Sequence, residues 1–210
     1  DVYKRQIVIQ QAGTGHVAAL VGGRDSNVAM AFNRATRIRR QPGSVIKPVI
    51  AYAPALELCG YTAASMLLDE PTTFADYAPR NFNNKYYGWV TLREAVQRSL
   101  NVPAVKVLNE VGLGQGKAFA ESLGVSFDKT DTSLTLALGG FTYGVSPWQL
   151  AGAYAAFASE GVYDTPTVIR YITDAAGRVL YEYEPESNRV MSKENAYILT
   201  SMLESAIEEG

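Results

Sequence analysis

Hydrophobic residues typical of β-strands gather in two pairs of short runs, one pair near each end of the chain. The first pair is residues 7–11 and 16–22, and the second is residues 168–173 and 178–183. Within each pair the runs are separated by a short segment that contains glycine. Short β-rich runs joined by such turns predict two β-hairpins.

Between the two hairpins, the longest apolar stretch covers residues 44–58 and is apolar on most helical faces. This pattern predicts a buried helix. Cys59, the single cysteine, follows this stretch and is expected to be a small buried hydrophobe rather than a reactive thiol. Residues 75–89 are rich in aromatic residues and asparagine, lack a clear period, and predict an ordered loop over the body.

Capping residues and glycines mark the starts of five further helices. In chain order these starts are Thr91, Asn101, a glycine-rich separator at residues 112–116, Ser146 and Ser192. Thr91 and Ser146 open capping-box patterns, because Glu or Gln follows three residues later. Proline in the first turn after Asn101 and after Ser146 is compatible with a helix start, where a missing N–H costs little.

The order of elements is therefore strands, then helices, then strands. This order predicts an α+β fold, with an antiparallel sheet flanked by helices and an all-helical subregion, rather than repeated βαβ units. A length of 210 residues suits one compact domain.

Composition narrows the possible partners. The formal net charge is -2, which offers no electrostatic basis for a nucleic-acid partner. No uninterrupted apolar stretch reaches the ~18 residues that a transmembrane helix needs, so a membrane anchor would lie outside these residues. One cysteine cannot form an internal disulfide, and the redox compartment stays open.

Several kinds of chemistry are excluded by the residues present. A Ser-His-Asp triad would need His16, the single histidine, as its base, but its neighbours are typical of an ordinary strand start. One histidine and one cysteine do not make a typical zinc site, and no nucleotide-binding fingerprint is present. Catalysis would therefore use Ser, Thr, Tyr, Lys or carboxylates, and no cofactor or metal is implied.

The sequence Pro42-Gly43-Ser44-Val45-Ile46-Lys47 contains one such candidate pair. If a helix begins at Ser44, positions i and i+3 share a face and Lys47 lies beneath the Ser44 hydroxyl. Apolar neighbours and the positive end of a helix disfavour the ammonium form, so the pKa of Lys47 should fall and its neutral amine could accept the serine proton. By itself the pattern is weak, because a capping serine and a surface lysine would look the same.

Ser99-Leu100-Asn101 lies between two predicted helices. This turn can project Ser99 and Asn101 to one side, where Ser99 could relay a proton from Lys47 to a leaving amine. Asn101 could hold a substrate amide and accept a hydrogen bond from Lys47. Both residues could instead be ordinary helix caps.

Together, S-x-x-K at Ser44 and S-x-N at Ser99 resemble two of the three motifs of the penicillin-binding protein and serine β-lactamase superfamily, the third being K-T-G. Flanking blocks extend the resemblance to the transpeptidase domain of class A (bifunctional) penicillin-binding proteins. These blocks are residues 33–36, 77–82, 88–93, 137–140, 144–147 and 151–158.

The resemblance implies a D,D-transpeptidase. Ser44 would attack the D-Ala-D-Ala carbonyl of a peptidoglycan stem peptide, and the acyl group would then pass to an amine of a neighbouring stem. β-Lactam antibiotics would acylate Ser44 as substrate mimics. The resemblance further implies a glycosyltransferase domain nearer the N-terminus of the full-length protein and a place at the outer face of the bacterial cytoplasmic membrane.

The chain departs from the family at the third motif. Lys129-Thr130-Asp131 is a near match, but it carries aspartate in place of glycine and precedes the 137–140 block, so we expect an ordinary loop there. The K-T-G strand is expected beyond Gly210. We therefore interpret residues 1–6 as linker or non-native and residues 7–210 as a partial transpeptidase domain, poorly folded and inactive alone.

Two alternatives remain open. A β-lactamase or D,D-carboxypeptidase would pass the acyl group to water, although the glutamate run that class A β-lactamases use for deacylation is absent from the sequence. A non-catalytic peptidoglycan-binding module would have no need of Ser44, Lys47, Ser99 and Asn101, all of which are present.

Overall fold

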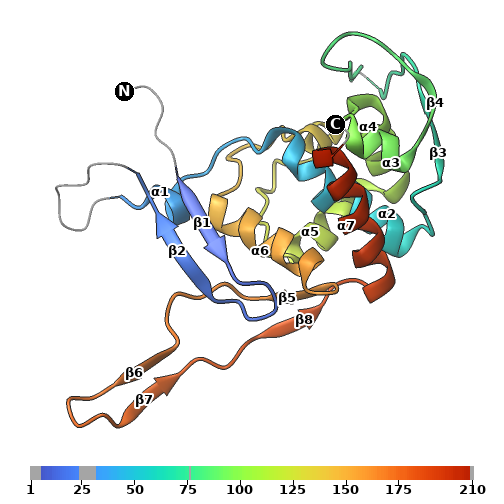
Figure 1. Ribbon diagram of the computed structural model, residues 1–210. Coiled ribbons are helices and arrows are strands. Elements are labelled where there is room, and N and C mark those ends of the chain that lie inside the picture. Colours follow the sequence, from blue (N-terminus) through green and yellow to red (C-terminus); the bar gives the residue numbers. More distant parts are fainter. Residues whose placement is uncertain (1–5, 24–31, 76, 209–210) are drawn as a thin grey trace.

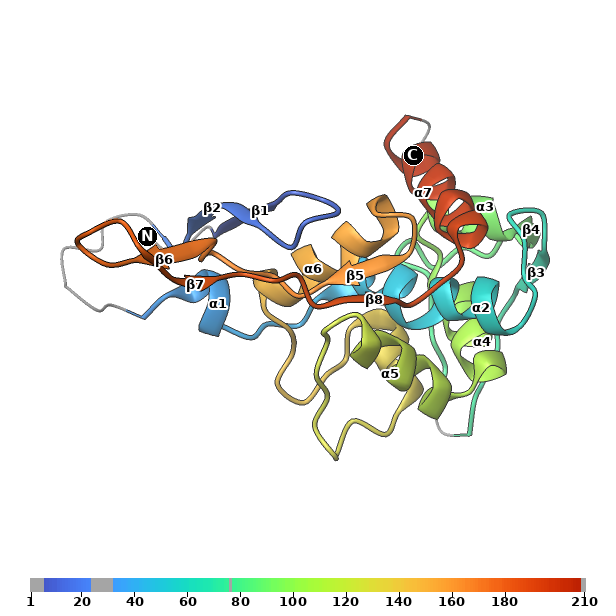
Figure 2. The same cartoon turned by 90° about the horizontal axis from the view of Figure 1, so that it is seen from below.

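The computed structural model describes residues 6–23, 32–75 and 77–208. Figures 1 and 2 show the larger helices gathered into one body, with a long hairpin of β6 (Tyr171–Thr173) and β7 (Val179–Glu182) extending away from it. Most of the interpreted linker, residues 1–5, and the C-terminal Gly210 lie outside the described residues.

The strands of the described residues form four separate two-stranded antiparallel sheets. These sheets pair β1 (Ile7–Gln10) with β2 (Val17–Val21), β3 (Met66–Asp69) with β4 (Gly88–Thr91), β5 (Val162–Asp164) with β8 (Ser187–Arg189), and β6 (Tyr171–Thr173) with β7 (Val179–Glu182). The first and last pairs confirm the two predicted hairpins. The mixed α+β composition is confirmed, but four small sheets stand in place of the one predicted sheet.

The other two strand pairs were not predicted, because long segments of the chain separate the two strands of each pair. β3 and β4 enclose most of the predicted 75–89 loop, and β5 and β8 enclose the whole β6–β7 hairpin. Strands of three or four residues show too little alternation to be recognised alone, and their pairing depends on contacts that are distant in sequence.

The buried stretch at residues 44–58 is helical but not one α-helix. It consists of a 3₁₀ turn (Gly43–Ile46), a π-helical segment (Pro48–Tyr52) and α2 (Ala53–Leu58). Proline cannot donate to an α-helical hydrogen bond, so the bonding pattern changes at Pro48. The N–H of Lys47 reaches back three residues to Ser44, and that of Ala53 reaches back five residues to Pro48.

Seven further helical elements complete the described chain. They are α1 (Arg34–Arg37), α3 (Leu92–Gln97), α4 (Asn101–Val111), α5 (Leu113–Ser122), a 3₁₀ turn (Leu134–Leu138), α6 (Pro147–Ala158) and α7 (Lys193–Glu208). The predicted starts at Thr91, Asn101 and Ser146 are confirmed. Ser146 and Gln149 form the full capping box, whereas the Thr91 hydroxyl accepts from the N–H of Glu94 and the Glu94 carboxylate pairs with Arg98 instead.

The predicted glycine-rich separator at residues 112–116 is wrong beyond Gly112, because α5 begins at Leu113. Gly116 lies inside α5, where an added Cβ would stand 2.6 Å from a methyl group of Leu108 and 2.7 Å from the carbonyl oxygen of Ile50. This glycine therefore allows close packing between helices rather than a break in the chain.

The apolar core lies where the π-helical segment and α2 pack against α4, with α7 packed against α2, α3 and α6. Representative fully buried residues are Ile46, Val49, Ile50, Leu108, Leu199 and Met202. Burial of the 44–58 stretch is thus confirmed for residues 46–56, whereas Ser44, Val45 and Leu58 are exposed. No helix in the described ranges is long and apolar enough to cross a membrane.

The expectation that Cys59 is buried is wrong, because Cys59 is exposed. The helix α2 ends at Leu58, and Cys59 occupies its C-cap position before Gly60, whose φ of 68° turns the chain away. The residue thus lies just past the buried part of the helix rather than within it.

Candidate active site

Ser44 and Lys47 lie on the 3₁₀ turn and on the residue that follows it. The Ser44 side chain is exposed, whereas Lys47 is only 2% exposed. Both residues line a cavity of about 310 Å³, together with Ser99. An accessible hydroxyl and a buried amine therefore share one cavity.

The amine of Lys47 joins the two sequence motifs directly. Its Nζ donates to the backbone oxygen of Ser99 at 2.6 Å, to the Ser99 Oγ at 3.2 Å and to the Asn101 Oδ1 at 2.7 Å. The hydrogen bond that was expected between Asn101 and Lys47 is present. The structure thus brings all four predicted site residues to one place.

Burial lowers the pKa of Lys47 from 10.5 to about 7, because the ammonium ion loses hydration inside the protein. Of the apolar neighbours in sequence, Ile46 and Val49 are fully buried, but Val45 is 49% exposed. The predicted direction of the pKa shift is confirmed, and tertiary burial causes it.

Ser99 adopts an uncommon backbone conformation. Its φ of 51° lies in the left-handed region, which non-glycine residues rarely occupy and which stores strain. In this conformation both the carbonyl and the hydroxyl of Ser99 reach Lys47. Serine is not a residue that signals positive φ, so sequence reasoning had no means of detecting this feature.

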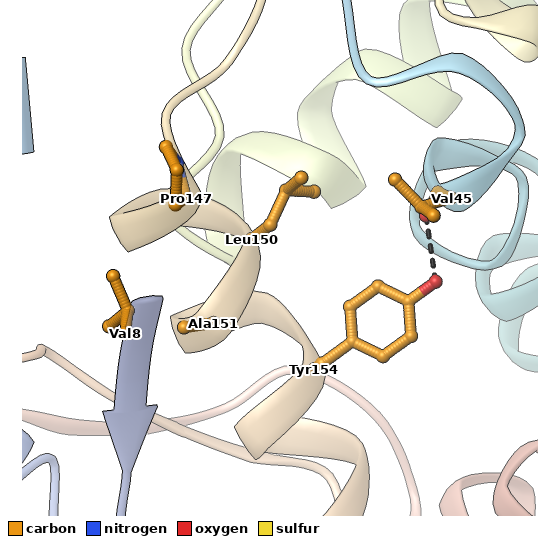
Figure 3. Close-up of a pocket in the computed structure, with 6 residues that line it drawn as sticks. All are labelled: Val8, Val45, Pro147, Leu150, Ala151 and Tyr154. Atoms are coloured by element: carbon orange, nitrogen blue, oxygen red, sulfur yellow. Dashed lines mark hydrogen bonds between the residues drawn. The ribbon is translucent and has the colours of Figure 1, made fainter. Parts of the chain in front are cut away.

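Tyr154 on α6 is a further residue of the site that the sequence did not indicate. Its hydroxyl donates to the carbonyl oxygen of Val45 at 2.7 Å, and burial raises its pKa to about 12. Figure 3 shows the ring reaching from α6 to the turn that carries Ser44. The same ring lines both the Ser44 cavity and a neighbouring apolar cavity of about 430 Å³, whose other walls include Val8 and Leu150.

His16 and residues 129–131, which were not predicted to be catalytic, lie outside the Ser44 cavity. His16 forms a bridge with Thr167 and packs against the ring of Tyr183, away from the Ser44 cavity. Lys129 and Thr130 lie in a turn, and the buried carboxylate of Asp131 accepts from the N–H and hydroxyl of Thr142. The near match to K-T-G is a loop, as expected. Among the residues that the structure describes, no cluster of His, Cys, Asp or Glu could hold a metal ion.

Residues 6–210 match the family described as the penicillin binding protein transpeptidase domain. The chain belongs to this family. Penicillin-binding protein 1F of Bacillus subtilis (strain 168) is 41% identical over 197 residues, which cover 94% of this chain and 27% of that protein. The chain thus spans about a quarter of the length of this curated relative.

Solved structures of penicillin-binding proteins have the same fold. Penicillin-binding protein 1A from Haemophilus influenzae superposes with a TM-score of 0.86 at 30% identity, covering 98% of this chain and 35% of that one. The PonA1 protein from Mycobacterium tuberculosis, determined in complex with penicillin V, superposes with a TM-score of 0.80 at 23% identity over 96% of this chain and 56% of its own. The sequence matches and the likeness to the Haemophilus influenzae protein place the chain among the transpeptidase domains of class A penicillin-binding proteins, which include the 1A and 1F types.

Proposed function

We propose that this chain provides the acylation site of a peptidoglycan D,D-transpeptidase, with Ser44 as the nucleophile and Lys47 as its general base. The observation that carries the proposal is the buried Lys47 amine, which is held by Ser99 and Asn101 in the cavity that Ser44 opens into. With a pKa of about 7, a substantial fraction of Lys47 is neutral at neutral pH and able to accept a proton.

In the first step the Ser44 hydroxyl would lose its proton to Lys47 while its oxygen attacks the carbonyl between the two D-alanine residues of a stem peptide. The backbone N–H of Ser44 would supply one donor to the oxyanion. The bond to the terminal D-alanine then breaks, and the proton would travel from Lys47 through Ser99 to the leaving amine. The products are an acyl-enzyme and free D-alanine.

In the second step an amine of a neighbouring stem peptide would attack the acyl-enzyme. Lys47 and Ser99 would take the proton from this amine and return it to the Ser44 oxygen, which restores the free enzyme. The Asn101 Nδ2 donates to a backbone carbonyl and its Oδ1 accepts from Lys47, so its part would be to hold the amine in place as well as to contact a substrate amide.

The acyl-enzyme can be tested with a fluorescent penicillin on the full-length protein. Ser44→Ala should abolish covalent labelling, and Lys47→Ala should lower the labelling rate by about 10⁴-fold or more, because the serine loses its base. The control is Ser133→Ala, because Ser133 is exposed, lies outside the cavity and its hydroxyl accepts from the N–H of Thr135 within its own turn. Labelling that persists in Ser44→Ala would contradict the assignment.

The fate of the acyl group separates the transpeptidase from its two alternatives. With a pentapeptide donor and an added amine acceptor, we expect D-alanine release together with a cross-linked product. Rapid hydrolysis of a chromogenic β-lactam would instead indicate a β-lactamase or carboxypeptidase. Absence of labelling by any penicillin would favour a non-catalytic peptidoglycan-binding module.

The wider setting is part of the same proposal. Class A relatives at 30% identity or more are several times longer than the matched region, which supports a second domain, for which we propose a glycosyltransferase. An enzyme that acts on peptidoglycan needs its substrate outside the cytoplasmic membrane, and we propose that location, with the membrane anchor in another part of the protein. Residues 7–210 would then be part of the transpeptidase domain.

A further inference from the structure

Two buried polar residues outside the four-residue site are connected to it through hydrogen bonds. Asp69, at the end of β3, is 1% exposed, and Asn81, in the segment before β4, is 4% exposed. Burying such polar groups destabilises the folded state unless each of them is hydrogen-bonded, so their hydrogen bonds show what holds them in place.

Asn81 caps the helix α4, which begins at Asn101. The N-cap residue of this helix is Leu100, whose side chain cannot accept a hydrogen bond. Instead, the Oδ1 of Asn81 accepts from the backbone N–H of Asn101 at 2.8 Å and from that of Val102 at 3.3 Å. The cap therefore comes from a separate segment of the chain and fixes the first residue of α4 in place.

Asp69 sets the orientation of this cap. The Nδ2 of Asn81 donates to both carboxylate oxygens of Asp69, at 3.0 and 2.8 Å, and to the carbonyl of Lys85 at 2.8 Å. Because an ionised carboxylate only accepts hydrogen bonds, it holds the amide nitrogen on its own side and turns the amide oxygen toward α4. The N–H of Tyr87 donates to Asp69 at 2.9 Å and holds the carboxylate in turn.

The side chain of Asn101 is held by the same segment. Its Nδ2 donates to the carbonyl of Arg80 at 2.8 Å, which leaves its Oδ1 to accept from the Lys47 Nζ at 2.7 Å. Arg80 and Asn81 thus control the side chain and the backbone of Asn101 together.

We propose that Asp69 and Asn81 are positioning residues for the acylation reaction, because they orient Asn101 so that its Oδ1 faces Lys47. This inference rests on the proposed function for its effect on rate, whereas its geometric content stands independently. A pair that merely stabilised the loop would change the melting temperature and leave the chemistry of Lys47 unaltered.

The test exchanges the two side chains in the full-length protein. Asn81→Asp keeps an oxygen that can accept from the N–H of Asn101. It replaces the donor Nδ2 by a carboxylate oxygen, which cannot donate to Asp69 or to the Lys85 carbonyl and is repelled by Asp69, so the hydrogen bonds that hold residue 81 in place should be lost. We expect the rate constant of penicillin acylation to fall about tenfold or more. Combining Asp69→Asn with Asn81→Asp restores one donor between the two positions and should recover most of the lost rate.

The pH profile distinguishes positioning from simple support. Loss of the Asn101 acceptor removes a hydrogen bond that favours the ammonium form of Lys47, so the acid limb of the rate profile should move to lower pH in Asn81→Ala, which removes the amide without adding a charge. The double variant, which keeps the net charge of the unaltered protein, should leave the acid limb in place. Asn84→Asp is the matched control, because it makes the same chemical change as Asn81→Asp at an exposed position of the same segment. Its rate and its pH profile should equal those of the unaltered protein.

A crystal structure of Asn81→Asp completes the test and does not depend on activity. We expect the Asn101 Oδ1 to be withdrawn from the Lys47 Nζ. If Asn101 keeps its place, or if the rate falls only in proportion to the unfolded fraction and the pH profile of Asn81→Ala is unchanged, the inference is overturned. Failure of the proposed function would look different, since the unaltered protein would then show no labelling that Ser44→Ala removes.

Discussion

At the scale of single residues, the proposed chemistry depends on an amine that is poorly solvated. Lys47 is the largest charged side chain among the fully buried residues, and its three hydrogen-bond acceptors all belong to Ser99 and Asn101. These acceptors are neutral, so they compensate the lost hydration only in part. A lysine kept near its neutral form at ordinary pH is the state that a general base requires.

The first prediction concerns the pH dependence of acylation. Because the pKa of Lys47 is lowered to about 7, the acylation rate constant should rise with pH, be half-maximal near pH 7 and level off above it. Stopped-flow measurement with a fluorescent penicillin gives this profile. A rate that keeps rising to pH 10 would show that Lys47 titrates as an ordinary lysine and would contradict the assignment.

The pH dependence of the free energy of unfolding tests the same pKa without relying on activity. The folded-state pKa of Lys47 lies below the unfolded value of 10.5, so between these values the unfolded state binds more protons and the free energy of unfolding rises with pH. Lys47→Met removes this contribution. Its stability relative to the unaltered protein should therefore be most favourable below pH 7 and should decline as pH rises toward 10.5, as measured by denaturation across that range.

At the scale of elements, three helices, α3, α6 and α7, border the cavity beside the turn that carries Ser44. On one side, α6 holds this turn through Tyr154 (Figure 3). On the other, Arg93 of α3 donates to the carbonyl of Ser201 at 2.9 Å and to the hydroxyl of Ser205 at 2.7 Å, which ties α7 to α3. Since α7 supplies Leu203 to the wall of the Ser44 cavity, these contacts set the cavity's shape.

The second prediction concerns Tyr154→Phe, a variant that lacks only the Tyr154 hydroxyl. Tyr154→Phe keeps the ring between the two cavities but leaves the Val45 carbonyl without this donor. We expect a loss of about 1 kcal/mol in stability and a fall of about threefold to tenfold in acylation rate, because the serine turn is less firmly held. Thermal unfolding and penicillin labelling measure the two effects.

The matched control is Tyr197→Phe on α7, because Tyr197 is 75% exposed and lies outside the cavity. It should change neither quantity. A Tyr154→Phe variant that loses stability but acylates at the unaltered rate would show that the hydrogen bond supports the fold without positioning Ser44.

At the scale of the whole molecule, the described residues hold two of the family's three sequence motifs in one cavity. The neighbouring apolar cavity lies between β1 and α6, beside the turn that carries Ser44. The β1–β2 hairpin is a two-stranded sheet with Ile7 and Ile9 about half exposed, a poor arrangement for independent stability.

The third prediction concerns the rate of Ser44 acylation by penicillin in the 210 residues alone, relative to the full-length protein. The family resemblance implies that a K-T-G strand would provide a second oxyanion donor, and no K-T-G is present in this sequence. Without that donor, acylation of Ser44 by penicillin should be slower by about 10²–10³-fold or more. Labelling of the 210-residue chain at a rate equal to that of the full-length protein would contradict this prediction.

Local features of the fold were predictable where short-range rules decide the outcome. The two hairpins with glycine-containing turns and the helix starts at Thr91 and Ser146 depend on residues only a few positions apart. The change of helix type at Pro48, the exposure of Cys59 and the pairing of β3 with β4 were not predicted. They depend on the missing N–H of a proline in a packed helix, on where a helix ends against the body, and on strand partners distant in sequence.

The sequence by itself determined which groups are available for catalysis: a serine and a lysine three residues apart, an S-x-N motif, and no histidine suited to be a base. Only the tertiary structure decided that Lys47 meets Ser99 and Asn101, 52 and 54 residues away, and that Asn81 and Asp69 hold Asn101 in place. The reason is physical. The identity of a reactive group is a local property, whereas burial, the resulting pKa and the orientation of an amide arise from segments that packing alone brings together.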